Sequence, residues 1–169
     1  RHADCFEKRE LVDRALAALV REVEEGVAAV PVPTPAPASG SFAEFGELVT
    51  VPAIEEEQAT LLFFHGFGDS ARGFVSQLPK LLQLPSVRYV LPTAPSQGGM
   101  RSWFSFASDT TLRGAGAASR SLAYAHWLIQ QELARGVSGD SIFVGGFSQG
   151  GSVAVQAAPA PAELPSGPL

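Results

Sequence analysis

Apolar and polar residues follow two different periods along this chain, and the two periods alternate. Short segments that are apolar throughout, or that alternate in polarity, are typical of β-strands. They lie at residues 47–52, 59–64, 87–92 and 141–146. Longer segments with apolar residues three and four positions apart predict helices at 71–84, 117–135 and 149–158, with a loop at 93–108. This alternation predicts an α/β domain with a mostly parallel sheet and flanking helices.

The first 44 residues differ from the rest of the chain. Residues 3–27 predict a helix whose apolar stripe consists of Val12, Leu16, Leu19, Val20, Val23 and Val27. The alternating Pro and Ala of AAVPVPTPAPASGS, at 28–41, favour an extended linker. We therefore expect a helical appendage at 1–27, a Pro/Ala-rich linker at 28–44, a domain at 45–158 and a disordered Pro-rich tail at 159–169. The appendage either packs on the domain, binds a partner or belongs to an upstream region.

Composition narrows the class of protein. With 46% hydrophobic and 17% charged residues, the chain has the make-up of a soluble globular protein. A formal net charge of −5 and the absence of a Lys/Arg cluster argue against a nucleic-acid partner. The single cysteine, Cys5, excludes a disulfide within the chain and favours a reducing, cytoplasmic setting. No apolar stretch approaches the roughly 20 residues that span a bilayer, so we expect no stable membrane insertion.

One serine lies between glycines just after the last predicted strand. Gly146-Phe147-Ser148-Gln149-Gly150 matches the pattern G-x-S-x-G, which holds a nucleophilic serine on a strained turn between a strand and a helix. The glycines keep side chains out of the turn, and the N-terminus of the next helix points its N–H groups at a developing oxyanion. Because the motif follows a predicted strand and opens a predicted helix, we interpret Ser148 as a nucleophile. The alternative is a serine that only caps the helix.

A second glycine-rich turn, HGFGD at 65–69, follows the strand predicted at 59–64. A hydrolase of this type takes one oxyanion N–H from the residue after the nucleophile and another from a loop after an early strand. We therefore expect the N–H groups of Phe67 and Gln149 to form the oxyanion hole. His65 stands at the end of the strand, where we expect it to brace the loop rather than act as a general base.

Four segments together resemble the acyl-protein thioesterase and carboxylesterase family of α/β-hydrolases, also called the phospholipase/carboxylesterase family. They are LLFFHGFGDS (61–70), YVLPTAP (89–95), GGMRSWF (98–104) and SIFVGGFSQGGSVA (141–154), within a similarity that runs from Val49 to Ala157. The resemblance implies an α/β-hydrolase fold and a serine hydrolase without metal or organic cofactor. Its substrates would be acyl thioesters or carboxylic esters, such as palmitoyl groups on proteins or lysophospholipid acyl chains. It assigns Ser148 as nucleophile, Phe67 and Gln149 to the oxyanion hole, and Trp103 to substrate binding.

The chain departs from the family pattern after the serine. In this family an Asp and then a His follow the nucleophile, but residues 149–169 contain neither, and Glu163 is their only acid. His2 lies in the appendage, and His126 lies within a predicted helix, where we expect a surface or structural role. Ser105 stands where the family usually has an acid. We therefore expect a fold truncated after the nucleophile turn, an exposed strand at 141–146, and little turnover by this chain as it stands.

Three interpretations remain open from the sequence. The first is a hydrolase of the acyl-protein thioesterase type that acts on an acylated protein or a small acyl ester. The second is a non-catalytic α/β module that binds an acyl chain or lipid in an apolar groove near Phe67, Trp103 and Phe104 without cleaving it. The third is another α/β-hydrolase, such as a peptidase or a lipase, which the combination of HGFGD, SWF and GFSQGG disfavours.

Overall fold

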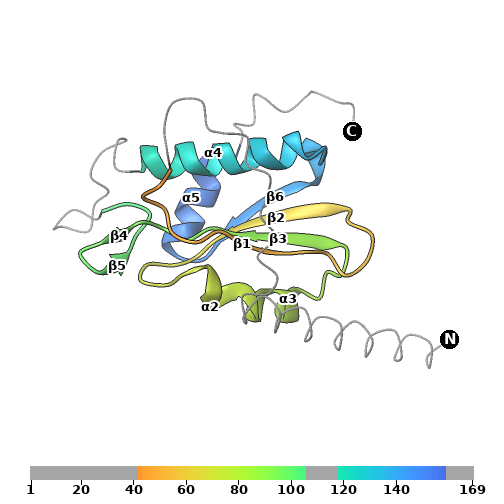
Figure 1. Cartoon of the computed structure of the whole chain (residues 1–169), viewed down its shortest axis with the longest axis horizontal. Coiled ribbons are helices and arrows are strands. Elements are labelled where there is room, and N and C mark those ends of the chain that lie inside the picture. Colours follow the sequence, from red (N-terminus) through yellow and green to blue (C-terminus); the bar gives the residue numbers. More distant parts are fainter. Residues whose placement is uncertain (1–41, 106–117, 159–169) are drawn as a thin grey trace.

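The computed structural model describes residues 42–105 and 118–158 of the 169-residue chain (Figure 1). The predicted appendage at 1–27, the linker up to residue 41 and the tail at 159–169 lie outside the described residues. The described part is built from one four-stranded sheet, one small hairpin and helices on both faces of the sheet.

The four-stranded sheet has the order β1-β3-β2-β6, and its strands are β1 (Val49–Val51), β3 (Val87–Leu91), β2 (Ala59–Phe64) and β6 (Ile142–Gly146). Strand β2 is central and pairs in parallel with both β3 and β6, whereas β1 pairs antiparallel with β3 at the edge. The sequence-based prediction of a mostly parallel sheet with an edge strand at 47–52 is therefore confirmed.

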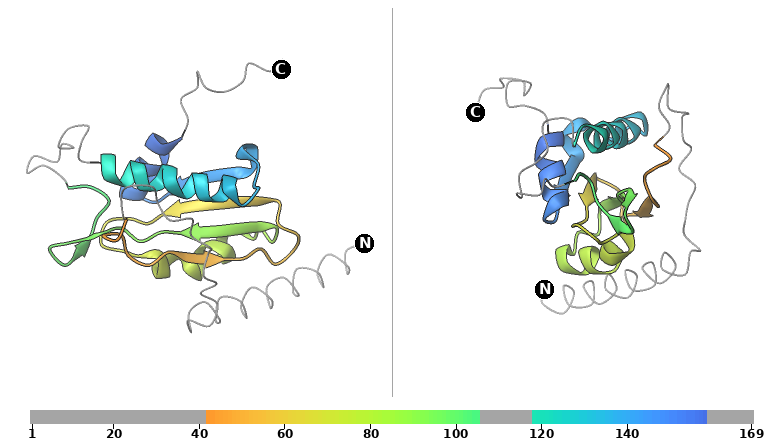
Figure 2. Two further views of the ribbon diagram at one scale, coloured as in Figure 1. Left: turned by 45° about the horizontal axis from the view of Figure 1, so that its top comes forward. Right: turned by 90° about the vertical axis from the view of Figure 1, so that its left-hand side faces the viewer.

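Helices cover the two faces of this sheet in separate layers (Figures 1 and 2). Helices α4 (Ser119–Ala134) and α5 (Gln149–Ala157) lie on one face, while α2 (Ala71–Val75) and α3 (Gln77–Leu82) lie on the other. Each face has its own apolar core. The larger core contains Phe45, Leu62, Phe64, Trp103 and Leu128, among others, and the smaller one contains Val51, Val75, Leu78, Tyr89 and Leu91. The α/β-hydrolase type of layering expected from the sequence is thus present.

The domain begins slightly earlier than the boundary expected at Phe45. The Phe42 ring lies 5.1 Å from that of Tyr124 and 5.6 Å from that of Trp127, both on α4, and packs against the larger core. Glu44 forms an ion pair with Arg120 of the same helix. Residues 42–44 therefore belong to the domain rather than to the linker, because an aromatic side chain at position 42 contributes to core packing.

Residues 71–84 form two short helices instead of the single helix predicted. The division falls at Ser76, and Pro79 is the third residue of α3. In one continuous helix, Pro79 would remove the bond to the carbonyl of residue 75 and clash with it, whereas the first turn of a new helix needs no such bond. Helix α3 then ends at Gln83, which has a left-handed backbone with φ 51°.

The stretch predicted as a loop, 93–108, contains a small hairpin. Strands β4 (Ser96–Gln97) and β5 (Met100–Arg101) pair antiparallel around Gly98 and Gly99, whose φ angles are 60° and 84°. Two consecutive residues with positive φ favour glycine and are typical of tight hairpin turns. The Gly-Gly pair was thus a usable signal for this hairpin. Residues 106–108 lie outside the described part of the chain.

Strand β6 pairs with β2 on one side and, within 42–105 and 118–158, has no strand on its other side. Phe143, in its middle, is 57% exposed. Within the same residues, no helix has the length and apolar character needed to cross a membrane.

A buried carboxylate ties α4 to the start of the sheet. Glu132 accepts a hydrogen bond from Thr60 Oγ1 at 2.9 Å and one from Arg135 Nε at 3.1 Å. Its Oε2 also lies 3.7 Å from Nε of the largely buried Arg88, and this Nε atom has no hydrogen-bond partner. Glu132 is therefore the main charge that compensates Arg88 inside the protein.

Replacing Glu132 by alanine should destabilise the domain by about 3–5 kcal/mol, because the largely buried Arg88 would lose its nearest carboxylate and Thr60 its acceptor. The change is measured as the free energy of unfolding in urea. The matched control is Glu57→Ala, which removes the more exposed partner of Arg135 and should cost at most about 1 kcal/mol. An equal decrease in the free energy of unfolding in the two variants would contradict this role of Glu132.

Candidate active site

The site forms where two parallel strands end side by side. Phe64, the last residue of β2, is in register with Gly146, the last residue of β6. The backbone N–H of Phe147 donates to the carbonyl of Phe64 at 2.9 Å and so extends this pairing by one residue. The turn after β2 and the turn after β6 are therefore held next to each other at the carboxyl edge of the sheet, where α/β proteins commonly bind ligands.

Ser148 occupies the turn between β6 and α5. Its backbone has φ 52° and ψ −117°, an unfavourable conformation for a residue with a side chain. The residue is exposed, and α5 begins immediately after it. The strained turn between strand and helix is present as the sequence predicted, and the Ser148 side chain makes no capping hydrogen bond. The role of Ser148 as nucleophile stays a prediction.

The two glycines of the motif are required by close backbone contacts. A Cβ atom on Gly146 would lie 2.4 Å from the carbonyl oxygen of Gly150. A Cβ atom on Gly150 would lie 2.1 Å from the carbonyl oxygen of Phe64 and 2.4 Å from that of His65. Helix α5 thus approaches the end of β2 so closely that no side chain fits between them.

The glycine-rich loop at 65–69 lies beside the serine. A Cβ atom on Gly66 would lie 3.6 Å from Cβ of Ser148 and 3.0 Å from the Phe147 ring. The N–H of Gln149 belongs to the first turn of α5, where helical N–H groups have no acceptor within the helix. The structure therefore brings together the loop that carries Phe67 and the helix start that carries Gln149. Their joint action as an oxyanion hole stays a prediction.

His65 braces this loop from inside the protein. It is fully buried, its Nδ1 lies 2.6 Å from the carbonyl oxygen of Gly66, and its Nε2 accepts a hydrogen bond from the Ala94 N–H at 3.0 Å. Burial lowers the pKa of this imidazole below its ordinary value, so the neutral form is favoured. Because both ring nitrogens bond to backbone groups, His65 supports the loop, as expected, and does not act on Ser148.

The side chain of Gln149 organises the neighbouring loop, which the sequence analysis did not anticipate. Its Oε1 accepts a hydrogen bond from the Trp103 N–H at 2.9 Å, and its Nε2 donates to the Phe104 carbonyl at 2.7 Å and to Ser102 Oγ at 3.0 Å. All of these residues are buried. A buried glutamine whose amide satisfies two backbone groups fixes the position of the loop relative to α5.

Trp103 lies in the core rather than at the surface of the site. Its side chain is 2% exposed and packs against the rings of Phe64 and His65, with Nε1 donating to the His65 carbonyl at 2.8 Å. Phe104 is equally buried. The groove expected near Phe67, Trp103 and Phe104 therefore does not have these last two side chains as an open lining. Direct contact between Trp103 and a substrate stays a prediction.

The open apolar surface beside Ser148 comes from three other side chains. Phe67, Met100 and Phe147 are 50%, 46% and 60% exposed. A Cβ atom on Gly66 would touch Phe147, and one on Gly68 would lie 2.9 Å from Cε of Met100, so Phe147 and Met100 lie against the 65–69 loop. Only Phe67 was anticipated from the sequence. Met100 and Phe147 lie within the quoted segments GGMRSWF and GFSQG but carry no chemical group that marks them.

No general base for Ser148 is found within residues 42–105 and 118–158. His65 is engaged elsewhere, and His126 is exposed on α4, as expected for a surface residue. Ser105, at the position where an acid was expected, bonds to Gln97 of the hairpin at 2.9 Å. His2 and Glu163 lie outside the described residues. No cluster of His, Cys, Asp or Glu suited to a metal ion occurs in the described part either.

Comparison with known proteins agrees with this architecture. A sequence profile of the Phospholipase/Carboxylesterase family matches residues 46–164, more than half of the chain. The chain belongs to this family. It is 38% identical over 121 residues to acyl-protein thioesterase 1 of Neurospora crassa, which covers 61% of this chain and 49% of the relative. It is 32% identical over 124 residues to acyl-protein thioesterase 1 of Schizosaccharomyces pombe, which covers 68% of this chain and 55% of the relative.

Solved structures of the family extend this agreement to the fold. The crystal structure of Zea mays acyl-protein thioesterase 2 matches with a TM-score of 0.53 and 30% identity, over 66% of this chain and 50% of that one. The Bacillus cereus carboxylesterase matches with a TM-score of 0.56 over 68% of this chain and 53% of that one, at 15% identity, which supports the fold alone. This family member spans about half the length of the curated relatives that it matches.

Gly150→Ala should disrupt the site, because the new methyl group would have to displace the backbone of β2. We expect a cost of about 3 kcal/mol or more, above the usual range for overpacking, since the contact is with backbone and not with a movable side chain. Thermal unfolding followed by circular dichroism measures the loss. Gly139→Ala is the matched control, because its methyl group would meet only Cδ2 of Leu133, at 3.9 Å. A Gly150→Ala domain as stable as this control would contradict the packing described.

The buried His65 should make the stability depend on pH. Because burial lowers its pKa in the folded state, the unfolded chain binds a proton that the folded chain does not. The free energy of unfolding should therefore fall as pH is lowered through about 6.5, the ordinary histidine value. His65→Gln should flatten this slope between about pH 7.5 and 5, whereas His126→Gln should keep it. An unchanged slope in His65→Gln would show that another group is responsible.

Proposed function

We propose that this protein is a serine hydrolase that cleaves acyl thioesters or carboxylic esters, with Ser148 as its nucleophile. The observation that carries the proposal is the strained backbone of Ser148, with φ 52°, at the exposed start of α5 and next to the Gly66 loop. Strain of this kind persists only where the surrounding structure enforces it, and it is concentrated at functional sites. Here it is enforced by the glycine contacts between α5 and β2.

The chemistry follows from this arrangement. The Ser148 hydroxyl attacks the carbonyl carbon of the acyl group, a base takes its proton, and the carbonyl oxygen becomes an oxyanion. In this proposal the N–H groups of Phe67 and Gln149 donate to that oxygen, aided by the N-terminal end of α5. Loss of the thiol or alcohol, which takes up the proton, leaves an acyl-serine ester that water then hydrolyses.

The exposed side chains of Phe67, Met100 and Phe147, which we call the apolar rim, favour a substrate with a hydrocarbon chain. Phe67, Met100 and Phe147 expose apolar surface on and against the loop beside Ser148, and burying such surface against a fatty acyl chain is favourable at about 25 cal/mol per Å². Relatives with 32–38% identity carry the name acyl-protein thioesterase. An acylated protein or a small acyl ester is therefore the proposed substrate, with protein depalmitoylation in a reducing, cytoplasmic setting as the proposed context.

Proton transfer is the part of the reaction that the described residues do not supply. In triad enzymes, loss of one member leaves on the order of 10³–10⁴-fold catalysis over water, from the oxyanion hole and binding. The second candidate function, acyl-chain binding without cleavage, is favoured by the same observation, since the apolar rim is present and no base contacts Ser148 in the described part of the chain.

An added base separates the two functions. The chain should react with a fluorophosphonate probe at Ser148, slowly alone and at least about tenfold faster with imidazole in solution, because free imidazole recovers part of the 10²–10⁴-fold contribution of a general base. Intact-protein mass spectrometry measures the labelling. Ser148→Ala should not label, whereas the matched control Ser152→Ala, one turn along α5, should label like the unmodified chain.

Two results would contradict the hydrolase. One is equal labelling of Ser148→Ala and the unmodified chain. The other is a chain that binds a non-cleavable acyl amide yet shows neither labelling nor thioester cleavage with imidazole, which would establish the binding module instead.

A further inference from the structure

Helix α3 and the turn after it expose an apolar surface at the opposite end of the sheet from Ser148. Leu81 is 80% exposed, and Leu82 and Leu84 are exposed by 40% and 46%. Ser148 follows the carboxyl end of β6, whereas these leucines precede β3 in the chain. This surface is therefore separate from the apolar rim at the candidate active site.

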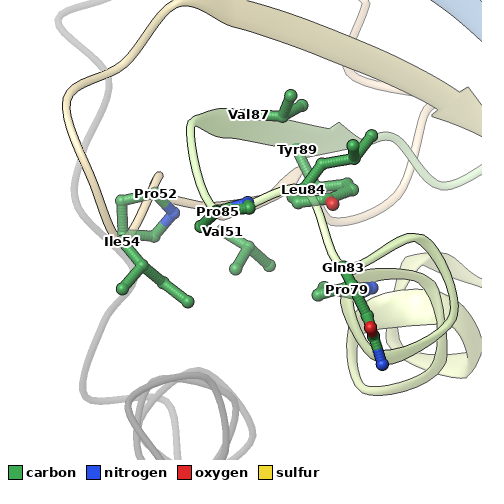
Figure 3. Close-up of a pocket in the computed structure, with 9 residues that line it drawn as sticks. All are labelled: Val51, Pro52, Ile54, Pro79, Gln83, Leu84, Pro85, Val87 and Tyr89. Atoms are coloured by element: carbon green, nitrogen blue, oxygen red, sulfur yellow. The ribbon is translucent and has the colours of Figure 1, made fainter. Parts of the chain in front are cut away.

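One of the three leucines, Leu84, lines a hollow in the surface (Figure 3). It is a shallow depression, and its walls come from α3, the end of β1 and the start of β3. Its lining is apolar except for Gln83 and the hydroxyl of Tyr89: Val51, Pro52, Ile54, Pro79, Gln83, Leu84, Pro85, Val87 and Tyr89. We call the hollow together with Leu81, Leu82 and Leu84 the α3 patch.

The chain itself carries an apolar stripe, predicted from the sequence to be helical, outside the described residues. Within residues 12–27 the stripe places Leu16, Leu19, Val20 and Val23 at offsets of zero, three, four and seven residues. This is the spacing with which an amphipathic helix inserts its apolar face into a hydrophobic groove. A helix of this length is marginal by itself in water and gains its stability from packing such a face.

The linker is long enough to let the stripe reach the α3 patch. Residues 28–41 separate the stripe from Phe42, where the domain begins. At about 3.1 Å per residue, a Pro-rich segment of this length extends over roughly 43 Å. A compact domain of about 100 residues has a radius of gyration near 13 Å, so such a linker reaches any of its faces.

Of the exposed apolar surfaces, the α3 patch fits a helix best. The rim of Phe67, Met100 and Phe147 surrounds Ser148 and has to admit a substrate under the proposed function. The outer side of β6 presents Phe143 beside unpaired backbone groups, which match an added strand rather than a helix, because a helix has already satisfied its own backbone. The α3 patch offers three leucines and a hollow with an apolar lining.

We propose that residues 12–27 dock as an amphipathic helix on the α3 patch of the same chain. Leu16, at the centre of the stripe, faces the domain, and the docked segment covers Leu81 and its neighbours. The docked segment thus contacts α3, the end of β1 and the start of β3 within one chain. The inference is independent of the proposed hydrolysis, since no residue of the site takes part.

Hydrogen exchange of the full chain tests the docking. Leu16→Glu should speed amide exchange in both residues 12–27 and α3 by about tenfold, the change expected when a docking equilibrium of ten to one is lost. Ala18→Glu is the matched control, because position 18 lies on the opposite face of the predicted helix from the stripe. It should leave exchange in both regions unchanged.

The reciprocal substitution tests the other surface. Leu81→Glu should speed exchange in residues 12–27, whereas Val155→Glu, at a 78% exposed position on α5, should not. These exposed substitutions leave the core intact, so folding does not confound the result. The proposal is overturned if Leu16→Glu and Ala18→Glu behave alike, or if Val155→Glu releases the segment as Leu81→Glu does. It is also overturned if protection of residues 12–27 disappears on dilution, which would place the contact between two copies of the chain.

Discussion

The site depends on a backbone contact between the start of α5 and the end of β2. Gly150 lies so close to the carbonyl oxygens of Phe64 and His65 that even a methyl group would overlap them. This contact fixes the direction in which α5 leaves β6, and the turn between them must then adopt the strained conformation of Ser148. The same contact sets the distance between Ser148 and the Gly66 loop. One short-range steric constraint thus places both the nucleophile and its neighbouring loop.

Buried polar groups then hold the rest of the site in place. Gln149 binds the backbone of Trp103 and Phe104, and Trp103 binds the carbonyl of His65, whose imidazole in turn bonds Gly66 and Ala94. Each of these groups would be costly to leave unsatisfied in the interior, by about 1–3 kcal/mol. The network therefore favours a single arrangement of the loops before any substrate arrives. Such preorganisation is what an oxyanion hole requires, because its donors have to be in position as charge develops.

The sequence predicted well what is set by local pattern, and less well what is set by contacts across the fold. The parallel strands, the turn at Ser148 and the bracing role of His65 all follow from residues that are close in sequence. The side chain of Gln149 was missed, because its partners lie 45 and 46 residues away. Trp103 was expected beside a substrate because the family resemblance assigned it there, and only its packing against Phe64 and His65 shows that it is interior. The break at Ser76 could have been predicted from Pro79.

The turn at Ser148 is held by contacts with β2 and the loop after it. Phe147 is bonded to Phe64, and Gly150 touches Phe64 and His65, so these contacts of the turn reach the end of β2 and the loop that follows it. They are formed without a strand on the other side of β6 in the described part of the chain. Activation of Ser148 is a different matter, since it requires a base that the described residues do not place near the hydroxyl. The proposed chemistry therefore has two separate requirements: under the proposal, stabilisation of the oxyanion would use groups that contacts between β2, β6 and α5 bring together, whereas proton transfer would need a base that the described residues do not place beside Ser148.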